Sequence, residues 1–229
     1  MTYEPVPQRV VPHAPLQTFK VRRGRLTTGQ SEALVRLWPA YGVRVDGTAL
    51  DLAALFGRSA PVVLDVGTGM GEATALAAAA DPDRDLLAVE VHTPGLAALL
   101  RRVEELGLRH VRVADGDARL LLADMLAPGS LDEVRVWFPD PWPKARHAKR
   151  RLMTRQFLTL LRDRLRTGGR LSFATDWEPY AEVVAGLLEA APGWRVVSRE
   201  RPPDRPETRF EEQGRRAGRA AHDLVAVTG

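Results

Sequence analysis

From residue 61 onward, short apolar runs alternate with longer segments of helical periodicity, and this alternation constrains the fold more than any other feature. The apolar runs predict seven strands, at 61–66, 86–91, 110–114, 133–138, 170–175, 194–198 and 222–227. The segments between them predict helices at 72–80, 94–106, 118–126, 149–165 and 178–190. Strands that alternate with helices of this length predict an α/β fold, with a mostly parallel sheet covered by helices on both faces.

The first 60 residues are less regular. Residues 1–18 are punctuated by prolines and predict a disordered arm, which leaves 19–229 as a single domain. Apolar spacing predicts a short helix at 31–38 and an apolar turn at 51–56 before the first strand.

Composition excludes several classes of protein. The chain has no cysteine, which excludes disulfides, thiolate metal sites and a cysteine nucleophile. No apolar run approaches the roughly 20 residues that a membrane span needs, so a cytoplasmic protein without a membrane partner is expected. His147 and His222 lack partners at metal-ligand spacing, and no metal site is predicted.

Basic residues are distributed unevenly along the chain. They gather at 20–25, 144–155 and 199–219, and all but three of them are arginine. Such an uneven field suggests a polyanionic partner such as a nucleic acid, although charge runs are often only solvated helix faces.

A glycine-rich turn follows the first predicted strand of the sheet. Gly67, Gly69 and Gly71 allow the backbone to approach a ligand closely, at the strand ends where α/β proteins bind ligands. A dinucleotide site would need a further glycine at position 72, where this chain has Glu72. A carboxylate there opposes a pyrophosphate at the helix N-terminus, which argues against NAD.

Three carboxylates stand at the ends of successive strands. Asp65 precedes the glycine turn, Glu90 ends the second strand where an acid can bind ribose hydroxyls, and Asp117 follows the third strand. Asp117 either faces an adenine amino group or only caps the helix that begins at Ala118. An acid-lined pocket suits a ligand with a ribose, an adenine and a cationic centre but no phosphate, and S-adenosyl-L-methionine is such a ligand.

Residues 137–144 read Trp-Phe-Pro-Asp-Pro-Trp-Pro-Lys, which predicts a stiff and extended segment that cannot belong to a helix. It is either a surface turn or part of a site that presents Asp140. Trp142 either stacks on a base or packs beneath the segment. Lys144 opens a basic stretch that would meet phosphates, namely Arg146, His147, Lys149, Arg150, Arg151 and Arg155. Asp176 either reaches the same pocket or caps the helix that starts near Glu178.

The chain resembles the bacterial tRNA (guanine-N7-)-methyltransferase family, whose members use S-adenosyl-L-methionine. The resemblance covers residues 19 to the end, and its segments are FKVRRGRLTTGQ (19–30), LDVGTGMG (64–71), VEVHTPG (89–95), FPDPWPKARHAKRR (138–151), ATDWEPY (174–180) and 208–223. It implies a Rossmann-like doubly wound fold with an antiparallel last strand, and methylation of a guanine in the tRNA variable loop.

The resemblance also implies roles for individual residues. Asp65, Glu90, Asp117 and Asp140 would contact the cofactor together with the glycine turn, and Asp140 would also lie at the reacting centre. Lys144, Asp176 and the run Thr208-Arg209-Phe210-Glu211, expected in a loop, would contact the tRNA. A methyltransferase for another substrate and a non-catalytic RNA-binding module are the alternatives, and the protein is expected to be a monomer or a homodimer.

Overall fold

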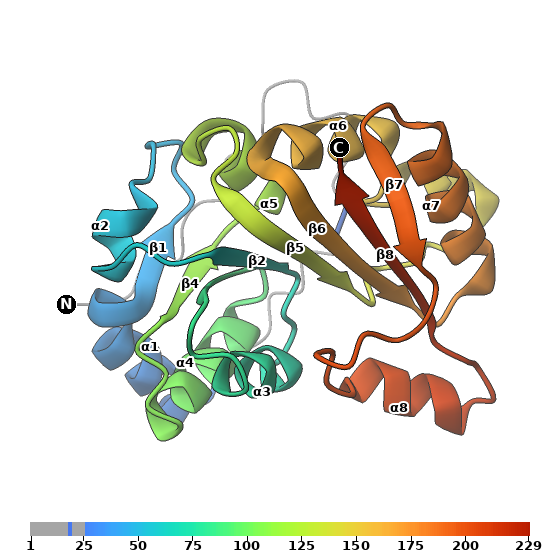
Figure 1. Cartoon of the computed structure of the whole chain (residues 1–229). Helices are drawn as coiled ribbons and strands as arrows, with labels where there is room; N and C mark the ends of the chain where they lie inside the picture. The colour runs from blue at the N-terminus through green and yellow to red at the C-terminus, as the bar shows by residue number, and fades with distance from the viewer. Residues whose placement is uncertain (1–17, 20–25) are drawn as a thin grey trace. The chain divides into compact units, whose positions relative to one another are not determined.

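The computed structural model describes residues 18–19 and 26–229 of the chain (Figure 1). These residues belong to two compact units, one formed by the chain up to residue 127 and the other by residues 128–229 with residues 18–19. The predicted arm falls almost wholly outside the described residues, and so does the basic cluster at 20–25.

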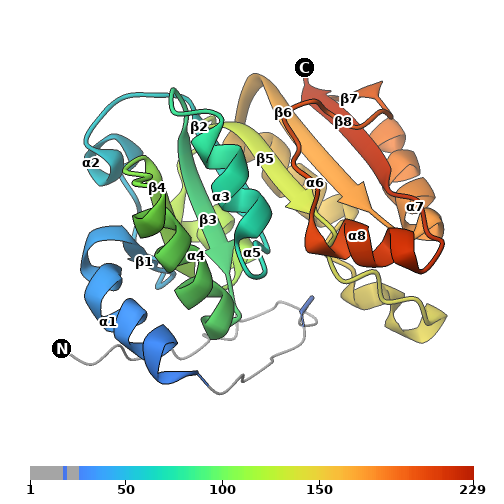
Figure 2. The ribbon, with the colours of Figure 1, turned by 90° about the horizontal axis from the view of Figure 1, so that it is seen from below.

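The first unit is built on a parallel sheet with the strand order β1-β4-β3-β2. Its elements are α1 (Thr28–Tyr41), β1 (Gly42–Arg44), α2 (Leu52–Phe56), β2 (Val62–Val66), α3 (Glu72–Ala79), β3 (Asp85–Glu90), α4 (Thr93–Glu105), β4 (Val111–Asp115), α5 (Ala118–Leu120) and the π-helical turn η1 (Leu121–Met125). Helices α1, α3 and α4 lie side by side (Figure 2) and bury their apolar faces with β3 and β4 in one core.

The second unit has the strand order β5-β6-β8-β7. Its elements are β5 (Leu131–Trp137), the 3-10 helix η2 (Ala145–Arg150), α6 (Arg155–Arg164), β6 (Leu165–Thr175), α7 (Glu178–Ala190), β7 (Trp194–Ser198), α8 (Arg209–Arg216) and β8 (His222–Thr228). Strands β5 and β6 are parallel, whereas β8 lies between β6 and β7 and runs antiparallel to both. The expected antiparallel last strand is therefore confirmed.

All seven predicted strands are present, and the mixed α/β class is confirmed. An eighth strand, β1, was not predicted, because three residues are too few to show a pattern and are extended only through pairing with β4. The predicted start of the strand at 170 was also wrong. Strand β6 begins at Leu165, where the predicted helix was expected to end, and continues through Gly168 and Gly169.

Two helix predictions in the second unit were wrong as well. The helix expected from residue 149 begins at Arg155, after the N-cap Thr154, and the basic residues before it form the separate turn η2. The run from Thr208, expected in a loop, instead begins helix α8. No helix among the described residues is long and apolar enough to cross a membrane.

Candidate functional site

The glycine turn of the first unit joins β2 to α3 at the carboxyl edge of the parallel sheet. The turn is closed by a hydrogen bond from the Gly71 amide to the Thr68 carbonyl at 2.9 Å, and Gly71, with φ 74°, is the N-cap of α3. Helix α4 approaches the turn closely at Gly95, where a Cβ atom would overlap the Gly69 carbonyl oxygen. The turn is therefore confined on its α4 side by backbone, and only glycine fits at residue 95.

Glu90 organises this edge of the sheet. Its Oε2 accepts a hydrogen bond from the Gly69 amide at 2.7 Å, and its Oε1 accepts from the amides of Val91 at 2.7 Å and His92 at 2.9 Å. Burial raises the pKa of the Glu90 carboxyl above its ordinary value, and the nearby Asp65 raises it further, against the lowering effect of the three amides. A carboxylate has about four acceptor positions, so this one keeps capacity for one more donor.

The other two predicted carboxylates also lie at this edge. Asp65 is 3% exposed and accepts a hydrogen bond from the Thr74 hydroxyl in α3 at 2.7 Å. Asp117 is the N-cap of α5, accepting from the Arg119 amide at 2.9 Å, and it forms an ion pair with the Arg119 guanidinium at 2.7 Å. Asp117 therefore caps α5, and the Arg119 guanidinium contacts both of its carboxylate oxygens.

The donors and acceptors of the glycine turn fit a polar ligand without phosphate. The Thr68 hydroxyl is shielded from solvent and has no hydrogen-bond partner within the described part of the chain. Glu72 stands in the first turn of α3 and opposes a phosphate at that helix N-terminus. A free hydroxyl, a carboxylate with spare capacity and backbone that comes close are the features that a nucleoside ligand without phosphates requires.

In the second unit, the segment 138–143 is held at several points while Asp140 stays exposed. The Phe138 amide donates to the Ala174 carbonyl of β6 at 2.7 Å, and the Arg151 Nε donates to the Pro141 carbonyl at 2.9 Å. Trp142 is 6% exposed, so packing, rather than stacking on a ligand, is confirmed for its ring. Asp140 is therefore the charged side chain that this fixed segment presents to solvent.

The segment was predicted to be extended throughout, and this was wrong. Phe138 has φ 54° and Trp142 has φ 44°, and each of these residues precedes a proline. Proline disfavours the right-handed helical region for the residue before it, and both residues adopt the left-handed region here. Such residues cost on the order of 1–3 kcal/mol each and cluster at active sites.

The basic stretch after Asp140 contains arginines packed on aromatic rings and side chains that are exposed. The Arg150 guanidinium lies 4.9 Å from the centre of the Trp142 ring, and that of Arg151 lies 4.9 Å from the Tyr180 ring centre, so these arginines support the segment. The exposed side chains that remain available for phosphates are those of Lys144, Arg146, Lys149 and Arg155. The predicted phosphate contacts are thus divided between structural and exposed residues.

Asp176 lies against helix α8. Its Oδ2 accepts from the Arg219 Nε at 2.8 Å, and a Cβ atom at Gly214 of α8 would lie 3.0 Å from the same oxygen. The N-cap of α7 is Trp177, so the capping alternative for Asp176 was wrong. Two of the segments that the sequence singled out, 174–180 and 208–223, therefore meet at Asp176.

The run Thr208 to Glu211 forms the first turn of α8, and its residues face different environments. The Thr208 hydroxyl caps the helix by accepting from the Glu211 amide at 3.0 Å, whereas Arg209 and Phe210 are exposed. The Glu211 carboxylate pairs with Arg201 at 2.9 Å and with the buried Arg205 at 2.7 Å. Burial raises the pKa of Glu211, but the hydrogen bonds and charge of Arg205 outweigh it and hold the pKa below its ordinary value.

Sequence reasoning missed three residues that hold these sites together, namely Thr74, Gly95 and Arg205. Thr74 and Gly95 lie inside helical patterns where nothing in a single sequence marks a polar partner or a close backbone approach. The described residues contain no group of three His, Cys, Asp or Glu side chains that could hold a metal ion.

Comparison with known proteins gives strong matches over most of the chain. Residues 59–224 match a family model described as "Putative methyltransferase". A tRNA (guanine-N(7)-)-methyltransferase of Streptomyces avermitilis is 53% identical over 215 residues, which are 92% of this chain and 74% of that protein. The protein of the same name from Nitrosospira multiformis is 49% identical over 217 residues, 93% of this chain and 95% of that protein.

Among solved structures, the antibiotic-resistance methyltransferase Kmr has a TM-score of 0.53 and 21% sequence identity. The match covers 78% of this chain and 91% of that one. At this level of identity the likeness supports the fold.

Proposed function

Because this chain belongs to the tRNA (guanine-N(7)-)-methyltransferase family, we propose that it transfers a methyl group from S-adenosyl-L-methionine to guanine N7 in the variable loop of tRNA. The observation that carries this proposal is the identity of 49–53% to relatives of that name over nearly the whole chain. The family model matches residues in both compact units, which supports residues 19–229 acting as one catalytic domain.

The residues of the glycine turn would hold the methyl donor. Glu90 has capacity for one more donor and would bind a ribose hydroxyl, and Asp117 would face the adenine amino group. Asp65 and the backbone of Gly67, Gly69 and Gly71 would line the same pocket. When bound, S-adenosyl-L-methionine supplies an electrophilic sulfonium methyl group.

Guanine N7 carries an in-plane lone pair and no proton, so the reaction requires no general base. The protein must hold N7 in line with the methyl group and stabilise the positive charge that spreads into the purine. A carboxylate near the N1–H and 2-amino groups of the guanine performs the second task. Asp140 is assigned this role, because its segment is fixed on both sides and its carboxylate is exposed.

Helix α8 and the turn η2 would bind the tRNA. Exposed Lys144 and Arg209 offer charge to phosphates, and Phe210, which is 56% exposed, offers an aromatic face to a base. Glu211 and Thr208 support that surface from within, since the first pairs with Arg205 and the second caps α8. Asp176, which follows the end of β6, supports it through Arg219.

One assay tests the function directly. The protein is incubated with methyl-labelled S-adenosyl-L-methionine and unmodified tRNA, and the nucleosides are then separated. Label in 7-methylguanosine supports the proposal, label in another nucleoside identifies a different methyltransferase, and tRNA binding without transfer indicates a binding module.

The raised pKa of Glu90 predicts a pH dependence of donor binding. Ribose hydroxyls donate to the ionised carboxylate, and protonation also weakens its hydrogen bonds to the amides of Gly69, Val91 and His92. As the pH falls, Glu90 takes up its proton above the ordinary glutamate pKa of 4.5, and the affinity for S-adenosyl-L-methionine falls with it. Calorimetric titration of the donor at a series of pH values from neutral down to 4.5 measures the effect. An affinity for S-adenosyl-L-methionine that stays constant down to pH 4.5 contradicts the prediction.

A further inference from the structure

Arg205 is a buried arginine held by two carboxylates in the loop between β7 and α8. Its side chain is 0% exposed. Its Nε and one terminal nitrogen donate to the two oxygens of Asp223 at 2.6 and 2.9 Å, and its terminal nitrogens donate to those of Glu211 at 2.7 and 3.1 Å. Burial would lower the pKa of Arg205, but the hydrogen bonds to Glu211 and Asp223 raise it above its ordinary value. The guanidinium is therefore charged and fixed in orientation.

The partners of Arg205 belong to the two parts of the second unit that carry the proposed chemistry. Glu211 lies in the first turn of α8, beside the exposed Arg209 and Phe210. On the other side, the Arg205 guanidinium carbon lies 5.6 Å from the centre of the Phe138 ring, within cation–π range. Phe138 is the left-handed residue two positions before Asp140.

Asp223 fixes the guanidinium relative to the sheet. It lies opposite Ala174 in the antiparallel pairing of β8 with β6, and the Ala174 carbonyl accepts the Phe138 amide. Strands β6 and β8 therefore hold both the backbone and the ring of Phe138. The backbone is held by the hydrogen bond to Ala174, and the ring contacts Arg205, which Asp223 holds. A buried ion pair contributes little net stability compared with packed apolar residues, so orientation explains this network better than stability does.

We propose that Arg205 is a positioning residue. It fixes the position of the Asp140 segment through Phe138, and the position of the tRNA-binding turn of α8 through Glu211. This inference rests on the proposed function, since it assigns a task to Arg205 in that reaction. The arginine fork can satisfy two carboxylates and stack on a ring at once, whereas a lysine ammonium supplies the charge without the planar geometry.

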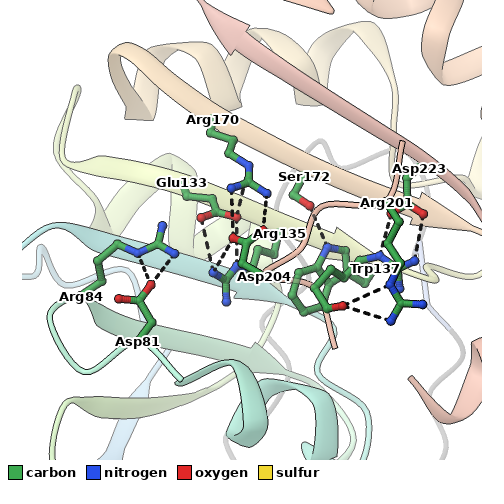
Figure 3. A network of polar contacts seen from close by, with 11 residues as sticks. Asp81, Arg84, Glu133, Arg135, Trp137, Arg170, Ser172, Arg201, Asp204 and Asp223 are labelled. Atoms are coloured by element: carbon green, nitrogen blue, oxygen red, sulfur yellow. Dashed lines mark hydrogen bonds and ion pairs between the residues drawn. The ribbon is translucent and has the colours of Figure 1, made fainter. Parts of the chain in front are cut away.

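The neighbouring Asp204 provides a matched control, because it anchors the same loop elsewhere. Its carboxylate pairs with Arg170 at 2.9 Å and lies 3.7 Å from Arg135, in the network that Figure 3 shows around Glu133. Asp204 takes no part in the proposed reaction, and Asp204→Asn weakens the loop's attachment while leaving Phe138 and Glu211 with their partners.

The experiment measures kcat, the KM for tRNA and the Kd for S-adenosyl-L-methionine in Arg205→Lys, Phe138→Leu, Asp204→Asn and the Arg205→Lys/Phe138→Leu double variant. Arg205→Lys should lower kcat by about tenfold or more and raise the KM for tRNA, with the Kd for the donor unchanged. Phe138→Leu should lower kcat alone. In the double variant, the effects on kcat should be less than additive, because both changes remove the same contact.

Asp204→Asn should leave all three constants at their original values. Wild-type kcat and KM in Arg205→Lys would overturn the proposal, as would an equal loss of kcat in Asp204→Asn, which would mean that the loop needs only an anchor. If Arg205→Lys does not fold, Phe138→Leu decides, since a lower kcat at unchanged KM supports the role and an unchanged kcat overturns it. An unaltered protein that leaves tRNA unmethylated would instead refute the proposed function.

Discussion

Replacing Asp140 with alanine should reduce kcat by on the order of 10²–10³-fold while the protein stays folded. The carboxylate is expected to stabilise the positive charge that develops on guanine, and that charge exists only as the methyl group is transferred. The fold should persist because the segment is held by Phe138, Pro141 and Trp142 and not by the exposed Asp140 side chain. Steady-state kinetics with tRNA and circular dichroism measure the two parts of this result.

Two further variants sharpen the test of Asp140. Asp140→Asn keeps the shape and removes the charge, so it should be as inactive as the alanine variant if charge is what matters. Asp83→Ala removes an exposed aspartate that also follows a proline, in a turn of the first unit, and should leave kcat unchanged. Near wild-type kinetics in Asp140→Ala with a native spectrum would refute the assigned role.

Replacing Gly95 with alanine should lower kcat/KM for S-adenosyl-L-methionine by on the order of 10²-fold. The new methyl carbon would lie 2.1 Å from the Gly69 carbonyl oxygen, so the turn between β2 and α3 would have to move. That movement breaks the 2.7 Å hydrogen bond from the Gly69 amide to Glu90, which organises the carboxyl edge of the sheet. Steady-state kinetics at varied donor concentration measure this loss, and calorimetric titration of the donor measures the part of it that is lost affinity.

Gly186→Ala is the matched control for Gly95→Ala. Gly186 also lies within a helix, α7, but no atom would lie within 4 Å of an added Cβ. Alanine there should stabilise the protein by about 0.5–1 kcal/mol, because glycine is a poor helix former, and donor binding should not change. Equal donor affinity in the two variants would show that the turn tolerates displacement.

The strands and the glycine turn could be predicted because their signals are local. A run such as Val62–Val66 is apolar at every position, and the glycines that follow it mark a turn where side chains are not tolerated. Strand β1 could not be predicted in this way, since Gly42–Arg44 is extended only because β4 lies beside it.

Helix α8 was missed although its sequence contained the signal. Thr208 and Glu211 have the spacing of a capping box, and the Thr208 hydroxyl does accept from the Glu211 amide. The density of charge around them suggested a loop. The Glu211 side chain does not complete the box, because it pairs with Arg205, and the burial of that arginine depends on tertiary contacts that no local pattern contains.

The position of β8 between β6 and β7 has a consequence for synthesis. Strands β6 and β7, the neighbours of β8 in the sheet, both precede it in the chain. They therefore emerge from the ribosome before the strand that pairs with both of them. Until residues 222–228 emerge, each neighbour exposes an unpaired edge, and such edges invite pairing with other chains. The second unit therefore completes its sheet only after residues 222–228 have left the ribosome, and a chain truncated before residue 222 should depend on chaperones more than the full chain.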